Sequence, residues 1–183
     1  MKLSQHEKKV EYLEFLICKI IPHFEAYDIK LSEIKNDLRI YFGNTKRWEG
    51  LYYSKKNKLN LTGLHEIRIS EKLQDPFDIA CVLIHELCHA MQYHLYGDGT
   101  RDHGIEFTNI AMRVGLDGHM PATYPNEELT KIIKNWIGEI YPNIFAIKTC
   151  QKLLSFTLYS LHIMTISFAS FYLTLLISRV LID

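Results

Sequence analysis

The chain has 183 residues, enough for one domain with a sizeable core and too few for two of ordinary size. Its 21 basic and 21 acidic residues give a formal net charge of zero, which excludes a global field that would attract nucleic acid or acidic substrates. The 4 cysteines show neither C-x-x-C spacing nor a disulfide framework, and no signal peptide is seen, so we expect a reducing, cytoplasmic compartment.

A capping box, Ser4-Gln5-His6-Glu7, predicts the start of a first helix over residues 5–26. Apolar residues follow the box at near-helical spacing, as expected for a helix that covers a core. They are Val10, Leu13, Ile17, Ile20, Ile21 and Phe24. We expect this helix to be structural.

Residues 37–70 change to short β-rich runs separated by turn residues, which predicts a small antiparallel sheet. The expected strands are 38–42, 48–53, 58–61 and 66–69. The same stretch mixes basic and aromatic residues, a composition that suits single-stranded nucleic acid through phosphate contacts and base stacking. On this evidence alone we favour the other interpretation, an exposed sheet face with solubilising lysines and core aromatics. The candidate nucleic-acid contacts are Arg39, Lys46, Arg47, Trp48, Lys55 and Lys56.

The chemistry of the sequence centres on His85-Glu86-Leu87-Cys88-His89. Asp75 as N-cap and Pro76 at the first helical position predict a helix that starts shortly before this motif. Residues four apart on a helix lie about 40° apart around its axis, so both imidazoles project from one face and can share one metal ion. Glu86 is placed to take a proton from water at that metal.

A catalytic zinc usually has three protein ligands and leaves its fourth position to water, so a third ligand is needed. His103 is the best candidate, because it follows a polar turn over 97–102 and precedes another helical pattern. Glu106 is an alternative, since zinc also accepts carboxylates, and Cys88 could either approach the metal or fill the core. Without a metal, the two motif histidines would be ordinary surface residues on a helix.

A turn-rich loop over 118–125 could line a substrate cleft, and Asn126-Glu127-Glu128 predicts the start of a fourth helix that runs to about Tyr141. A second donor to the oxyanion often completes a site of this kind. The candidates for oxyanion or substrate contacts are Tyr93, His119 and Tyr124.

Residues 143–183 form a hydrophobic tail that differs in kind from the domain over 1–142. Between 153 and 178 the tail has no Asp, Glu, Lys or Arg, and it is long enough to cross a bilayer as a helix. Lys148 and Lys152 would then keep the catalytic part in the cytoplasm. The other interpretations are a buried C-terminal helix and a tail unrelated to the function of the domain.

The motif His85-Glu86-Leu87-Cys88-His89-Ala90 is followed by a polar turn and by His103-Gly104-Ile105-Glu106-Phe107. With Arg47-Trp48 upstream and Val114-Gly115-Leu116 downstream, this pattern resembles the SprT-like (Spartan-type) family of zinc metalloproteases over roughly 38–129. The resemblance implies that His85, His89 and His103 bind zinc and that Glu86 is the catalytic acid/base. It also implies substrates bound to DNA, although the cysteine-rich zinc module of some relatives has no counterpart here.

The sequence therefore predicts an α+β, zincin-like domain whose short antiparallel sheet packs on the motif helix, with a hydrophobic C-terminal helix after it. The expected activity is hydrolysis of peptide bonds in a protein substrate by a metal-activated water, with one Zn²⁺ ion as cofactor and DNA-bound proteins as candidate substrates. The alternative is a non-catalytic, zinc-stabilised module that binds DNA or is tethered to a membrane. Candidate partners besides the substrate are single-stranded DNA and, through 153–178, a membrane.

Overall fold

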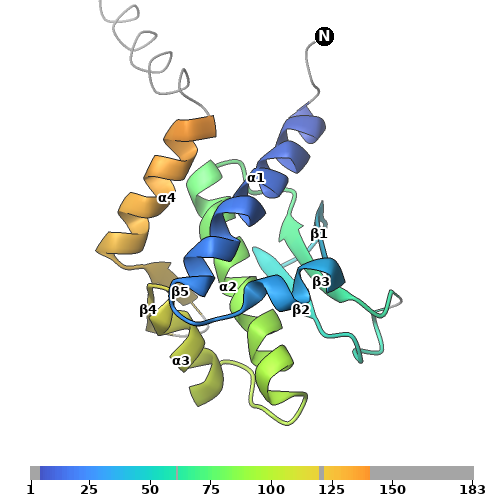
Figure 1. Cartoon of the computed structure of the whole chain (residues 1–183). Helices are drawn as coiled ribbons and strands as arrows, with labels where there is room; N and C mark the ends of the chain where they lie inside the picture. The colour runs from blue at the N-terminus through green and yellow to red at the C-terminus, as the bar shows by residue number, and fades with distance from the viewer. Residues whose placement is uncertain (1–4, 61, 120–121, 141–183) are drawn as a thin grey trace, which may run out of the picture. The chain divides into compact units, whose positions relative to one another are not determined.

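A computed structural model describes residues 5–60, 62–119 and 122–140 and shows a mixed α+β fold (Figure 1). Strands β1, β2 and β3 form one sheet, and β4 and β5 form a hairpin. The expected α+β class is therefore confirmed. The helices are α1 (Gln5–Glu25), the 3-10 helix η1 (Leu31–Asp37), α2 (Pro76–Tyr96), α3 (Ile105–Arg113) and α4 (Glu127–Ile140). The strands are β1 (Leu38–Gly43), β2 (Gly50–Tyr53), β3 (His65–Ser70), β4 (Leu116–His119) and β5 (Ala122–Pro125).

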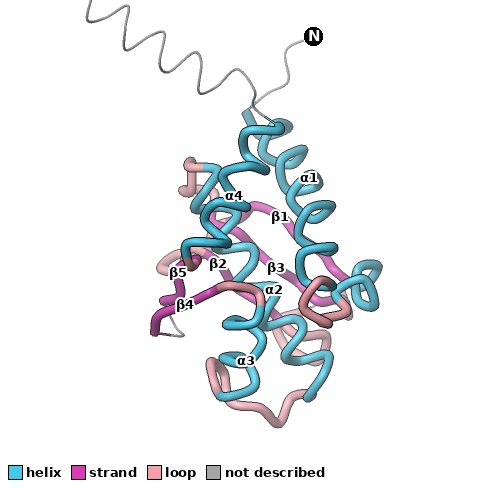
Figure 2. Tube along the Cα trace, turned by 60° about the vertical axis from the view of Figure 1, so that its left-hand side comes forward, coloured by secondary structure: helices cyan, strands magenta, loops and turns pink. Residues whose placement is uncertain are grey.

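Helix α1 covers the core, as its apolar stripe predicts. Of the predicted stripe, Leu13, Ile20 and Phe24 are buried, whereas Val10 is exposed. Leu16, which the predicted stripe did not include, is also fully buried. The helix lies against β1 and α4, and Figure 2 shows it beside the sheet. It is followed by η1, which sequence analysis did not anticipate; there Leu31 and Ile34, three residues apart, are both buried.

The three-stranded sheet is mixed, so the prediction of an antiparallel sheet is wrong for one of its two pairs. The strand order is β1-β3-β2; β3 runs parallel to β1 and antiparallel to β2. In the register of β3, Ile67 lies opposite Ile40 of β1 and Tyr52 of β2. The reason is burial: Ile67 and Ile69 are completely buried, so β3 takes the central place and separates β1 from β2.

The expected strand over 58–61 is also wrong for the residues that the structure describes, because residues 58–60 form a turn. Asn60 is buried there, and its side-chain amide donates to the backbone carbonyls of Ser54 and Leu64. These bonds satisfy carbonyl groups that would otherwise need a neighbouring strand. The connection between β2 and β3 is consequently a compact loop.

A turn-rich loop was expected over residues 118–125. The structure shows instead that β4 and β5 pair as antiparallel strands in this part of the chain. Asp117 pairs with Tyr124 and Gly118 pairs with Thr123. Gly118 has a φ of 91°, and a Cβ at this position would lie 2.4 Å from Cε1 of Tyr124. Only glycine suits both this backbone conformation and the close approach of the tyrosine ring.

Helix α4 begins as predicted, since the backbone N–H of Leu129 donates to Oδ1 of Asn126 over 2.9 Å. Its buried residues Ile133 and Trp136 close the core, where α4 contacts α1 and α2. Among the helices of residues 5–140, none is both long enough and apolar enough to cross a bilayer. The predicted boundary at 142 and the hydrophobic segment over 153–178 lie outside the described residues.

Candidate metal centre

Three imidazole rings meet beside α2. Nε2 of His103 lies 3.1 Å from Nε2 of His85 and 3.0 Å from Nε2 of His89. One ring nitrogen from each histidine lies within 4.8 Å of the corresponding nitrogens of the other two histidines. The alternative ligands, Glu106 and Cys88, do not belong to this cluster. Ligands bonded at 2.0–2.1 Å around a tetrahedral zinc ion would be roughly 3.3 Å apart, so these nitrogens suit such an ion.

Helix α2 places two of the three rings. The side chain of Asp75 accepts a hydrogen bond from the backbone N–H of Phe77 over 2.8 Å, and Pro76 starts the helix, as predicted. Four residues separate His85 from His89, which puts both on one face of α2. Leu83 and Leu87 are fully buried on another face and anchor the helix in the core.

His103 reaches the centre because the segment between α2 and α3 folds back along α2. The buried side chain of Gln92 donates to Oγ1 of Thr100 over 2.9 Å and to the carbonyl of Arg101 over 3.0 Å. Gly97 ends α2 with a φ of 74°, which starts the reversal. His103 itself has a φ of 51°, a left-handed conformation that is uncommon outside glycine and is retained mostly where function demands it.

Each histidine also has an oxygen beside its second ring nitrogen. Nδ1 of His85 is hydrogen-bonded to Oγ1 of Thr123 over 2.8 Å. The Asp102 carboxylate lies 3.3 Å from Nδ1 of His89 and 3.4 Å from Nδ1 of His103. Partners on Nδ1 orient a ring and leave Nε2 to a metal, an arrangement found around most metal-binding histidines.

The floor of the centre is apolar. Phe107 of α3 is completely buried, and its ring centroid lies 4.9 Å, 4.3 Å and 4.9 Å from those of His85, His89 and His103. Burial, followed by the neighbouring histidines, lowers the pKa of His85 to about 3, and burial followed by His103 lowers the pKa of His89 to about 3. Both rings are therefore neutral at pH 7, the state in which imidazole binds a metal.

Glu86 lies beside the three rings and under strand β2. Its side chain is buried, and a Cβ on Gly50 would lie only 2.5 Å from Oε1 of Glu86. Burial and then the charge of Asp102 raise the pKa of Glu86 to about 8. A carboxyl group that titrates near neutrality can both accept and return a proton.

Strand β2 also supplies Tyr52, whose ring stacks on His89 with an interplanar angle of 8°. The hydroxyl of Tyr52 is 2.7 Å from Nδ1 of His65, and His65 is completely enclosed by the fold. Because burial lowers the pKa of His65 to about 4, His65 is neutral and accepts the hydrogen bond. This hydrogen bond thus holds Tyr52 against a candidate metal ligand.

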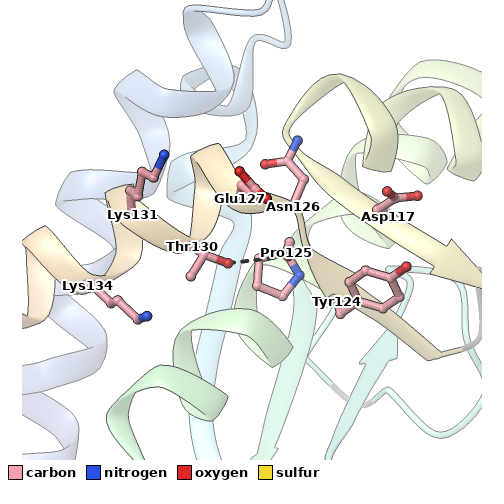
Figure 3. Close-up of a pocket in the computed structure, with 8 residues that line it drawn as sticks. All are labelled: Asp117, Tyr124, Pro125, Asn126, Glu127, Thr130, Lys131 and Lys134. Atoms are coloured by element: carbon pink, nitrogen blue, oxygen red, sulfur yellow. Dashed lines mark hydrogen bonds between the residues drawn. The ribbon is translucent and has the colours of Figure 1, made fainter.

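The centre opens into a cleft of about 960 Å³. Glu86 and the three histidines line the cleft, with β2 and the first turns of α2 on one side and β5 on another. A second hollow of about 480 Å³ lies between β5 and α4 and shares Tyr124 and Pro125 with the cleft (Figure 3). Its charged residues are two lysines and two carboxylates, so it favours neither sign of ligand charge.

The other candidate site residues do not all lie at the metal centre. Tyr124 lines the cleft, whereas Tyr93 packs against His65 with ring centroids 5.4 Å apart, and His119 lies at the exposed end of β4. Arg47 and Trp48 line the cleft as well. The remaining nucleic-acid candidates are spread over the sheet and its loops: Lys46 is exposed, Arg39 is 3.6 Å from Glu66, Lys55 is paired with Asp37, and Lys56 is 3.7 Å from Asp98.

Sequence reasoning missed four residues that shape the centre: Gly50, Tyr52, Asp102 and Thr123. Asp102 could have been suspected, because a carboxylate next to a ligand histidine is a common partner of metal-bound imidazole. The others come from strands far along the chain, and no local pattern marks them.

The fold and the centre define a class of protein: an α+β domain with a His-Glu-x-x-His helix and a third histidine that could bind the same metal. The model of the SprT-like family matches residues 22–126, more than half of the 183. The chain belongs to the SprT-like family, which confirms the resemblance seen in the motifs. No curated protein and no solved structure matches the chain significantly.

Proposed function

We propose that the protein is a zinc-dependent endopeptidase. The observation that carries this proposal is the position of Glu86, a buried carboxyl group beside three converging imidazoles at the base of an open cleft. A structural zinc site has no use for such a carboxylate and is usually closed by a fourth protein ligand. Among the described residues the cluster has three histidines, and the nearby thiol of Cys88 is fully buried in the core.

The residues present suit zinc, because three imidazoles with oriented Nδ1 atoms form a donor set that zinc prefers. When bound, the ion would supply a Lewis acid that makes water more acidic and polarises a carbonyl group. His85, His89 and His103 would hold it through Nε2. The Glu86 carboxylate takes a proton from the attacking water and then gives a proton to the leaving amine.

The proposal extends to DNA-bound protein substrates, with single-stranded DNA as a candidate partner. Membership of the SprT-like family supports it, as does the place of Arg47 and Trp48 at the cleft. Three of the six candidate contacts lie beside carboxylates of the chain, which reduces the positive charge that they offer to phosphate groups. We therefore propose peptide hydrolysis as the activity and DNA as a modulator to be tested separately.

The test compares the purified full chain with Glu86→Gln and His103→Ala. The substrate is a DNA-binding protein, assayed with and without single-stranded DNA, and zinc content is measured for each protein. We expect Glu86→Gln to keep its zinc and to lose about 10²–10⁴-fold in rate, the usual contribution of a general acid/base. His103→Ala should lose zinc affinity.

Cleavage that needs Glu86 but is indifferent to DNA would retain the peptidase and remove the DNA partner. Full activity of Glu86→Gln would refute the mechanism. Zinc-loaded protein that cleaves nothing would instead favour a non-catalytic binding module. A His103→Ala protein with unchanged zinc content would remove His103 from the ligand set.

A further inference from the structure

Two large aromatic side chains are exposed on the walls of the metal cleft. Trp48, in the segment between β1 and β2, is 65% exposed, and Tyr124 on β5 is 58% exposed. Strands β2 and β5 both contact α2, and in Figure 1 they lie on the two sides of this helix. Both rings line the cleft of the metal centre, one from the segment that leads into β2 and one from β5.

This placement distinguishes the pair from the other exposed apolar residues. The described part of the chain has eight large apolar side chains that are exposed, and only Trp48 and Tyr124 among them line the cleft. An isolated exposed apolar residue is normal on a protein surface, but aromatic residues that line a concave site are typical anchors for a ligand. An aromatic side chain can remove roughly 150–250 Å² of surface from water when it is covered.

The walls around the two rings are apolar as well. Phe77, Cys81 and Val82 from the first turns of α2 line the cleft, and Pro125 follows Tyr124. The charged groups that line the cleft are mostly acidic, so they disfavour an acidic ligand; they are Arg47, Glu49, Asp78, Glu86 and Asp102. The lining thus suits large apolar groups and disfavours acidic ones.

The shape of the site indicates an extended chain as the occupant. Strand β2 lies at the edge of its sheet, and an edge strand can pair with an added peptide strand through main-chain hydrogen bonds. Side chains of such a peptide alternate in direction, so residues near the metal centre would reach the walls. Pairing of this kind needs a substrate backbone whose N–H and C=O groups are free, as they are in an unfolded segment.

We propose that Trp48 and Tyr124 form two apolar subsites near the scissile bond, and that the preferred substrates are unfolded polypeptide segments with large apolar or aromatic residues around that bond. This inference rests on the proposed peptidase function and adds the substrate class to it. Tyr124 is assigned to this role through its ring, because the ring, and not the hydroxyl group, would cover an apolar side chain.

The first test measures binding, using full-length, zinc-loaded Glu86→Gln protein and two dye-labelled peptides. The peptides are identical except that phenylalanines near the centre of one are serines in the other. Binding is followed by fluorescence anisotropy, and also by tryptophan emission, because Trp48 is exposed whereas Trp136 is only 8% exposed. We expect the phenylalanine peptide to bind about 10–100-fold more tightly, as burial of an aromatic side chain allows, and to shift the Trp48 emission to shorter wavelength.

The variants Trp48→Ala and Tyr124→Leu, made in the same background, should each lose most of this preference. Tyr124→Phe should keep it, because the ring remains. Leucine retains an apolar contact with Gly118, and a melting curve for each variant checks that the domain is folded. The matched control is Tyr96→Ala, which removes an aromatic side chain that is 52% exposed but does not line the cleft.

Equal binding of the two peptides, or a preference unchanged in Trp48→Ala and Tyr124→Leu, would overturn the inference. The wild-type protein is then tested for cleavage of both peptides. Glu86-dependent cleavage at equal kcat/KM for the two would refute the inference and leave the proposed function intact. Absence of any cleavage would refute the proposed function, while the binding preference would still decide whether the aromatic subsites exist.

Discussion

Replacement of Asp102 by Asn should weaken the metal centre without touching a metal ligand. The carboxylate of Asp102 lies within 3.4 Å of Nδ1 on both His89 and His103. The two rings face different carboxylate oxygens, Oδ1 for His89 and Oδ2 for His103. Asparagine can place its one acceptor oxygen beside only one of them, and its NH₂ group, a donor, would face the other ring. The variant also removes the negative charge closest to these two imidazoles, a charge that favours a cation between them.

The expected size of the effect follows from the exposure of this carboxylate. Partners of ligand histidines usually contribute about 10–100-fold in metal affinity. The Asp102 side chain is 77% exposed, so water screens its charge and we expect the lower end of this range. A loss of about tenfold corresponds to about 1.4 kcal/mol of binding free energy.

The assay is a zinc titration in competition with a coloured chelator at pH 7, made with the wild-type protein, Asp102→Asn and Asp98→Asn. Asp98 belongs to the same segment between α2 and α3, but the closest ionic partner of its carboxylate is Lys56, at 3.7 Å. Equal zinc affinities for the two variants would show that the Asp102 carboxylate does not support the histidines. A loss of zinc affinity in Asp102→Asn but not in Asp98→Asn would show that the Asp102 carboxylate supports the ligand histidines.

Three further predictions follow from the contacts around strand β2. Gly50→Ala should displace Glu86 and lower the rate of peptide hydrolysis by about 100-fold at unchanged zinc content. The control is Gly99→Ala, whose added methyl group meets open space, and it should be fully active. Equal rates for the two variants would contradict the close packing of Gly50 against Glu86. Tyr52→Phe removes the donor to buried His65, so the free energy of unfolding measured with urea should fall by about 1–3 kcal/mol, and an unchanged midpoint would argue against this hydrogen bond. Burial lowers the pKa of His65 from 6.5 to about 4, so between these pH values the unfolded chain binds more protons than the folded protein. The free energy of unfolding should therefore fall as the pH drops from 6.5 to about 4. A free energy of unfolding that does not change over this range would refute the buried, neutral state of His65.

The sheet shows why long-range structure was harder to predict than the helices. Alternating apolar residues mark β1 and β3 as strands, but the same alternation suits a parallel or an antiparallel neighbour. The complete burial of Ile67 and Ile69 decides that β3 lies between β1 and β2, and burial depends on α1 and α2 packing against the sheet. The turn at residues 58–60 depends likewise on hydrogen bonds from Asn60 to residues on both sides of it.

The sequence by itself determined helix α2, its N-cap and the common face of His85 and His89, because these features depend on interactions between residues at most a few positions apart. It also identified His103, since the turn after α2 is short and polar. Only the tertiary structure placed Gly50 above Glu86 and Thr123 beside His85. These contacts join α2 to strands more than thirty residues away along the chain, and their partners are chosen by packing of the whole domain, which no local pattern encodes.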